Sequence, residues 1–232
     1  MSRRRRSSTQ GPCPLNTYVP GLATRTRFPL PDAPEHPMPF LWIGGRSRIA
    51  AHFDSLHNLA NVVAGRRRFT LFPPEQISNL YIGPIDFTPA GQPLSIVDFM
   101  SPDLARFPKF ETAMAAARVA VLAPGDAFYI PQLWWHHVES LDRLGAMINF
   151  WWGQSPIWAE PPMNALLHAL LAMGHLDAPE RAAWRTVFDH YVFDRPEGVV
   201  DHIPEHARGI AETLNRVYAR RLRATLLQAL DR

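Results

Sequence analysis

The stretch RVAVLAPGDAFYIPQLWWHHVES, residues 118–140, decides the fold class of this chain. It holds three short β-type runs, 118–122, 127–131 and 136–140, separated by a Pro-Gly-Asp turn and a second proline. The same pattern predicts further strands at 40–43, 50–54, 59–64, 67–72 and 146–152, with short helices at 74–79 and 110–117. Many short strands without long helices between them predict a mainly β fold, an antiparallel sandwich or barrel.

The two ends of the chain differ from this β-rich part. Residues 1–38 are rich in Arg, Ser, Thr and Pro and predict a flexible basic arm ahead of a β domain over 39–155. Residues 156–232 predict a helical region, because apolar side chains recur there at helical spacing. These include Leu166, Leu167, Leu170, Leu171, Trp184, Phe188, Ile210, Leu214, Val217, Tyr218, Leu222, Leu226 and Leu230. Their apolar face either packs against the chain's own barrel or forms a dimer interface.

Composition excludes several classes of protein. The 232 residues are 47% hydrophobic and 19% charged, so a sizeable core is expected, and no apolar run is long enough to span a membrane. The formal charge is +3, but residues 3–6 are all arginine and the rest sums to −1, which argues against nucleic acid as a partner. The single cysteine, Cys13, excludes an intramolecular disulfide and a thiolate zinc cluster. No apolar segment follows the arginines, so a cytoplasmic protein is expected.

Two histidine clusters indicate a metal site. His52 and Asp54 lie two residues apart on an expected strand, so their side chains point to the same face. In the second cluster, His136 shares a face with apolar Val138, which favours His136 inside the barrel and His137 outside. Two histidines and one carboxylate on a rigid sheet form the triad that binds non-haem Fe(II) and leaves coordination positions open. His-x-Asp alone is a weak signal, and the second histidine strengthens it.

Arg67 is the next candidate. It alternates with Phe69 and Leu71 on the apolar face of its strand and is expected to point into the barrel, while Arg66 and Arg68 stay in solvent. A buried guanidinium needs an anion, and a small dicarboxylate suits its two-pronged geometry. A structural ion pair with a buried Asp or Glu is the alternative.

Together these segments resemble the JmjC-like, cupin-type Fe(II)/2-oxoglutarate-dependent oxygenases, nearest to the factor-inhibiting-HIF-like asparaginyl hydroxylases. The resemblance runs over residues 40–152. It rests on His52-Phe53-Asp54 with Asn58, GRRRFTLFPP at 65–74, residues 124–140, and Asn149-Phe150-Trp151. It implies a double-stranded β-helix (cupin or jelly-roll) core, and the helical tail is similar in kind to the family's dimerising helices, which implies a homodimer.

The resemblance also implies roles for individual residues. His52, Asp54 and His136 would ligate Fe(II), and Arg67 would bind the distal carboxylate of 2-oxoglutarate, where the asparaginyl hydroxylases use Lys. The side chains expected to hydrogen-bond near this co-substrate are Asn58 and Asn149. The implied reaction uses 2-oxoglutarate and O₂ to hydroxylate a protein side chain, an amino acid or a small metabolite. Aromatic side chains that would shape the substrate mouth, or else pack in the core, are Trp134, Trp151 and Tyr129.

The chain departs from the family pattern at three places. Ile49 stands where relatives often have a co-substrate-binding Thr, and residues 93–94 are Pro-Leu where the asparaginyl hydroxylases have polar residues, so an asparagine substrate is not implied. Relatives also carry a longer stretch before the first histidine than the 51 residues here, so the chain is either naturally short or starts downstream of the true start. Two alternatives remain: a metal-binding regulatory or inactive homologue without turnover, and a cupin enzyme that uses metal without 2-oxoglutarate.

Overall fold

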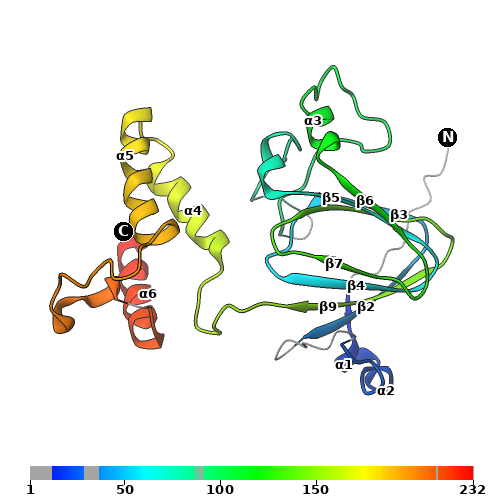
Figure 1. Ribbon diagram of the computed structural model, residues 1–232, viewed down its shortest axis with the longest axis horizontal. Coiled ribbons are helices and arrows are strands. Elements are labelled where there is room, and N and C mark those ends of the chain that lie inside the picture. Colours follow the sequence, from blue (N-terminus) through cyan, green and yellow to red (C-terminus); the bar gives the residue numbers. More distant parts are fainter. Residues whose placement is uncertain (1–11, 29–36, 87, 89–90, 213, 232) are drawn as a thin grey trace. The chain divides into compact units, whose positions relative to one another are not determined.

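Two antiparallel sheets face each other in the first part of the chain (Figure 1). The structure is a computed structural model that describes residues 12–28, 37–86, 88, 91–212 and 214–231. One sheet has the strand order β1-β2-β9-β4-β7 and the other the order β3-β8-β5-β6. Their bounds are β1 Cys13–Pro14, β2 Met38–Gly44, β3 Ser47–His52, β4 His57–Ala64, β5 Arg67–Phe72, β6 Arg118–Leu122, β7 Ala127–Ile130, β8 Trp135–Ser140 and β9 Gly145–Trp152.

This arrangement confirms the mainly β fold of the cupin type with a helical C-terminal region. Each of the eight strands expected between residues 40 and 152 is present, and the two short helices are η1 Pro74–Ser78 and α3 Phe110–Ala115. The short β-type runs bounded by Pro and Gly were sufficient to predict these eight strands.

That core lies between the two sheets. The barrel core is a cluster of buried side chains contributed by both sheets: Ala60, Val62, Phe69, Leu71, Leu122, Ile130, Val138 and Met147. Arg67 alternates with two of them along β5, and His136 with another along β8, so both side chains face the barrel interior.

A second cluster, the outer core, packs against the opposite face of the four-stranded sheet. It is formed by Ala51, Phe72, Leu80, Val97, Phe107, Phe110, Ala113 and Trp135. Several of these lie on the chain between η1 and α3 or within α3, in the connection from β5 to β6. This connection therefore covers strand faces that alternation alone would leave in solvent.

Part of the N-terminal arm is folded, which differs from the expectation for residues 1–38. β1 pairs with β2, and two short helices follow, α1 Leu15–Tyr18 and α2 Pro20–Ala23. Leu15 is fully buried beside Ile148 and Phe150, and this contact anchors the segment to the five-stranded sheet. The arginine run at residues 3–6 belongs to the expected flexible arm and lies outside the described residues.

The chain divides into two compact units, 1–153 and 154–232, and the second is helical. Its elements are α4 Pro162–Met173, α5 Ala178–Phe188, η2 Asp189–Phe193, η3 Glu205–Ala207, η4 Gly209–Ala211 and α6 Arg216–Leu230. Asp177 and Glu180 form a capping box at the start of α5, and Asn215 caps α6. Among the described residues, no helix has the length and apolar character needed to cross a membrane.

Candidate metal centre

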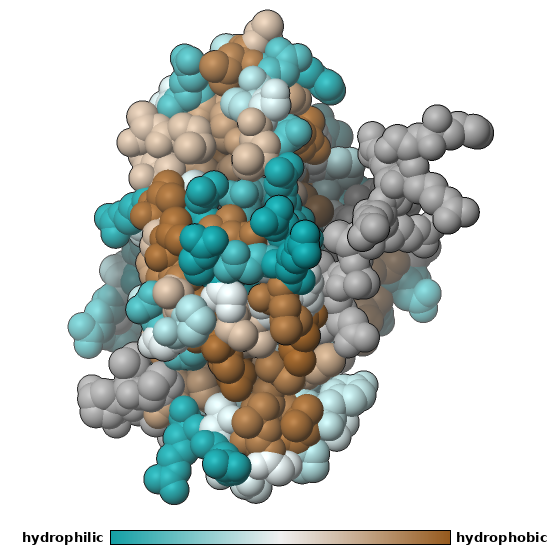
Figure 2. All heavy atoms as spheres, turned by 90° about the vertical axis from the view of Figure 1, so that its right-hand side faces the viewer, coloured by the Kyte–Doolittle hydropathy of each residue, from teal (hydrophilic) through white to brown (hydrophobic). Residues whose placement is uncertain are grey.

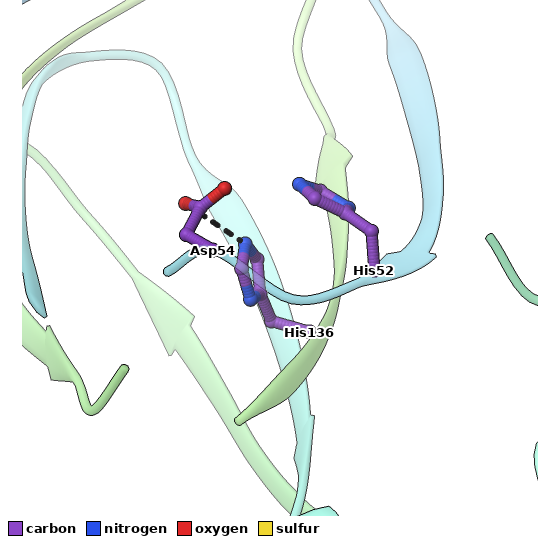
Figure 3. A group of neighbouring side chains, drawn as sticks. All are labelled: His52, Asp54 and His136. Carbon is purple, nitrogen blue, oxygen red and sulfur yellow. Dashed lines mark ion pairs between the residues drawn. The ribbon is translucent and has the colours of Figure 1, made fainter. Parts of the chain in front are cut away.

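His52, Asp54 and His136 converge on one point at the barrel interior (Figure 3). His52 ends β3, Asp54 lies in the following loop, and His136 lies in β8. One candidate ligand atom from each lies within 4.8 Å of the other two. Nε2 of His136 is 3.7 Å from Oδ2 of Asp54, and the two imidazole rings have centroids 4.3 Å apart. Residues 84 positions apart in sequence are thus brought to one place.

The backbone that presents the first two residues differs from the strand expected at 50–54. β3 ends at His52, and its pairing with β8 shifts register between Ile49 and His52. Such an irregularity bends the strand and re-aims the side chains that follow it. Asp54 therefore reaches His52 from a loop, and strand alternation is not the cause of their approach.

Each histidine ring is fixed by a backbone carbonyl. Nδ1 of His52 lies 2.9 Å from the carbonyl oxygen of Ala50, and Nδ1 of His136 lies 3.0 Å from that of Trp134. Because a carbonyl only accepts, Nδ1 carries the proton in each neutral ring. Both Nε2 atoms are then left with a lone pair, which is the state that a metal-binding histidine requires.

The electrostatics of the three groups also suit a cation. Burial, reinforced by nearby His52, lowers the pKa of His136 to about 3, so its ring is neutral near pH 7. Burial raises the pKa of Asp54, an effect opposed by His52 and by a side-chain hydrogen bond from Asn58. Two imidazole lone pairs and a carboxylate thus face one another at a site where His136 is buried and His52 and Asp54 are partly buried. Two imidazole nitrogens with one carboxylate oxygen are a donor set suited to Fe(II).

Arg67 is buried, with 5% of its surface exposed, and it lies in register with Ser140 of β8. Among the described residues, neither its Nε nor the Oγ of Ser140 has a hydrogen-bond partner. No ion pair joins Arg67 to an Asp or Glu in the same part of the chain. Burial lowers the pKa of the guanidinium. A buried cation with a free donor is suited to an anion that the described residues do not supply.

Asn58 and Asn149 form a buried pair, in which Nδ2 of Asn149 donates to Oδ1 of Asn58 at 3.2 Å. Sequence reasoning missed a third residue that hydrogen-bonds to this pair: Nε1 of Trp42 donates to Oδ1 of Asn149 at 2.8 Å. The alternation within 40–43 could have placed Trp42 on an inward face. Its partner across the sheet depends on strand order, which the sequence does not reveal.

The aromatic candidates for a substrate mouth lie in different places. Trp151 packs against Phe40 in a tilted arrangement with ring centroids 4.8 Å apart, and Trp134 packs against the barrel core. Tyr129 instead lies on the opposite face of β7 from the barrel core, exposed, and its hydroxyl bonds to Nδ1 of His57 at 2.8 Å. The structure therefore does not bring Tyr129 to the three-residue group.

His137 lies on the opposite face of β8 from His136, as alternation requires, but it is not in solvent. Its exposed fraction is 5%, and its ring stacks on Phe99 with centroids 4.4 Å apart. Phe99 belongs to the connection between β5 and β6 and packs against the outer core. The expectation of an outward, exposed His137 fails because this connection covers it.

Comparison with known proteins adds a family to this geometry. Residues 2–157 match the model of the cupin-like domain. HSPB1-associated protein 1 of Homo sapiens is 40% identical over 113 residues, 48% of this chain and 22% of that protein. Lysine-specific demethylase JMJ31 of Arabidopsis thaliana is 37% identical over 106 residues, which are 46% of this chain and 19% of that protein. The tRNA wybutosine-synthesizing protein 5 of Danio rerio is 33% identical over 105 residues, which are 45% of this chain and 29% of that protein. The chain thus spans less than a third of each of these relatives.

Proposed function

The chain belongs to the cupin-like domain family of JmjC type, and we propose that it is an Fe(II)- and 2-oxoglutarate-dependent oxygenase. The observation that carries this proposal is the convergence of His52, Asp54 and His136, with both histidines fixed as Nδ1–H tautomers. From the relatives, which include a protein named as a demethylase and one named for tRNA modification, the proposal takes the reaction class alone.

In this proposal the metal is held by Nε2 of His52, Nε2 of His136 and a carboxylate oxygen of Asp54. The carbonyls of Ala50 and Trp134 keep both rings oriented, an outer layer of contacts that metal-binding histidines need. Iron, when bound, supplies open coordination positions and the redox chemistry that couples decarboxylation of 2-oxoglutarate to oxidation of a substrate by O₂. The surrounding barrel keeps water from the reacting groups.

Arg67 binds the distal carboxylate of 2-oxoglutarate in this proposal. A guanidinium pairs with a carboxylate through two parallel hydrogen bonds, and its burial makes the pair strong. Ser140, opposite Arg67 on β8, offers a free hydroxyl as a second donor at the same level of the barrel. The Asn58–Asn149 pair contributes amide groups beside the metal ligands. The substrate is a protein side chain, an amino acid or a small metabolite.

The test is an anaerobic titration of 2-oxoglutarate into the Fe(II)-loaded chain, followed by the weak visible metal-to-ligand charge-transfer band. We expect the band in the native protein, its loss in His136→Ala because a ligand is gone, and its loss in Arg67→Ala because the anion is no longer held. Arg68→Ala is the matched control, since Arg68 lies on the same strand but pairs with Glu139 at 3.2 Å. Iron binding without a band in the native protein would contradict the proposal.

A metal-binding, regulatory homologue without turnover is the second candidate. It is favoured by Ile49, which lies opposite Val138 and packs against the barrel core, so that an apolar side chain stands where relatives often have a hydroxyl. The same titration separates the two candidates, because this one predicts metal binding with no response to 2-oxoglutarate.

A further inference from the structure

Arg118, the first residue of β6, lies in the same row of the four-stranded sheet as two of the candidate metal ligands. Arg118 is opposite Leu71 on β5, and Leu71 is opposite His136 on β8. His136 is in turn opposite His52 on β3. Residues directly opposite each other in antiparallel strands present their side chains on the same face of the sheet. Arg118 therefore shares the barrel-facing side with both histidines, two strand spacings or about 10 Å from the backbone of His136.

Alternation along β6 gives Arg118 the same orientation. Its side chain shares a face with Ala120 and Leu122, and both of these contact the barrel core. Val119 and Val121 lie on the opposite face and are exposed. Arg118 itself is also exposed, so it lies at the rim of the barrel beside the candidate metal centre and not in the core.

An aromatic ring holds the guanidinium of Arg118. Its Cζ lies 5.1 Å from the centroid of the Trp134 ring, in the geometry of a cation–π contact. Trp134 directly precedes β8 and packs against the barrel core, so this contact keeps the cation on the barrel-facing side of the sheet. A guanidinium that stacks by its flat face keeps the N–H groups at its edge for a hydrogen-bonding partner.

In the part of the chain that the structure describes, no acid neutralises Arg118. None of the ion pairs there includes it, whereas Arg66 pairs with Asp142 and Arg68 pairs with Glu139. A single guanidinium matches the one charge and the two oxygens of a carboxylate, to which it donates two parallel hydrogen bonds. A phosphate carries more charge and a third oxygen and calls for further donors.

We propose that Arg118 is a specificity residue that binds a carboxylate of the substrate, and that the substrate is therefore a molecule that carries a carboxylate. This inference rests on the proposed function, because it takes the metal centre as the place of reaction. It narrows the substrate to an acidic one, and it makes Trp134 the platform beneath the cation. Arg67 remains the residue for the co-substrate.

The test compares two chelators that bind the Co(II)-loaded full chain, by isothermal titration calorimetry. Both carry a hydroxamate for the metal. Suberic acid monohydroxamate ends in a carboxylate, and its counterpart of equal length ends in a neutral carboxamide. We expect the native chain to bind the carboxylate form about fivefold more tightly, the size of an ion pair at an exposed site. Arg118→Ala should bind both chelators equally, and Arg118→Lys should retain a smaller preference because it keeps the charge without the two-pronged geometry.

Arg106→Ala is the matched control. Arg106 also lies over an aromatic ring, 4.9 Å from the centroid of Phe107, but that ring belongs to the outer core, so this variant should keep the fivefold preference. Arg118→Ala should also keep the native affinity for 2-oxoglutarate in the charge-transfer titration. Thermal unfolding of the metal-free variants checks that each of them folds.

The outcomes separate this inference from the proposed function. A preference that persists in Arg118→Ala, or no preference in the native chain, would overturn the inference and leave the proposed function standing. Weaker binding of 2-oxoglutarate by Arg118→Ala would also overturn it, because Arg118 would then serve the co-substrate. A native chain that binds neither Co(II) nor the chelators would overturn both.

Discussion

His136 is a buried histidine whose neutral form the fold imposes. Its pKa is lowered to about 3 by burial, while an unfolded chain protonates a histidine near pH 6.5. Between these values the unfolded state holds one more proton, so stability is present above pH 6.5 and is lost as pH falls through this window. We expect the free energy of unfolding of the metal-free chain to drop by about 1.4 kcal/mol per pH unit from this group.

Chemical unfolding between pH 7 and 4.5 measures this effect. His136→Leu should reduce the slope of the free energy of unfolding against pH by the contribution of about one proton. His168 on α4 is exposed and gives a control, because His168→Leu should keep the slope of the native chain. An unchanged slope in His136→Leu would mean that this ring takes up its proton in the folded state, in disagreement with its burial.

At the residue scale, alternation along the strands was enough to predict the inward-facing side chains. Arg67 and His136 face the barrel because each alternates with apolar neighbours on one strand. Alternation cannot reveal what covers the other face of a strand, which is why His137 was expected in solvent. It also cannot supply the carbonyl partners of the histidine rings or the indole of Trp42, since these depend on strand order and on loop geometry.

At the scale of elements, the turn between β4 and β5 controls where Arg67 begins its strand. Gly65 has φ of +66°, and an added Cβ would lie 2.5 Å from the carbonyl oxygen of Leu144. The turn is also joined to residues 141–142: Arg66 contacts both oxygens of Asp142, and the backbone N–H of Leu141 donates to the Arg66 carbonyl.

Hydrophilic side chains gather near the centre of the molecular face seen in Figure 2.

Gly65→Ala should therefore destabilise the chain by about 2–3 kcal/mol, because it combines backbone strain with a clash against a neighbouring backbone. Gly125→Ala is the control: φ there is +99°, but nothing lies within 4 Å of the added Cβ, so a cost of about 1 kcal/mol is expected. Urea unfolding of both variants measures the difference. Equal costs would show that the contact with Leu144 gives way without penalty.

The element boundaries themselves were accessible from the sequence, since Pro and Gly mark most turns between the strands. The irregularity between Ile49 and His52 was not, because a bulge leaves an apolar and polar pattern that still predicts a strand. Leu15 and its two short helices were missed for another reason. The burial of Leu15 depends on Ile148 and Phe150 of β9, more than 130 positions away.

At the scale of the whole molecule, the helical unit does not bury many of its apolar side chains within itself. Among its described residues, Val200 is the one hydrophobic side chain in the buried class, whereas Leu171, Phe193, Val217 and Leu227 are each more than 60% exposed. Apolar surface of this kind marks an interaction site in a folded protein. The expected homodimer through the C-terminal helices would cover it, at about 25 cal/mol per Å² removed from water.

Sedimentation equilibrium of the full chain tests this prediction. We expect a dimer for the native chain and a monomer for Leu171→Glu and Leu227→Glu, because a charge in an apolar interface is not compensated. Leu144→Glu, at a 66% exposed position in the barrel unit, should remain a dimer. Co(II) affinity should be the same in all three variants, since the three candidate ligands lie within the barrel unit. A native chain that is monomeric at tens of micromolar would instead favour the alternative, in which the helices pack against their own barrel.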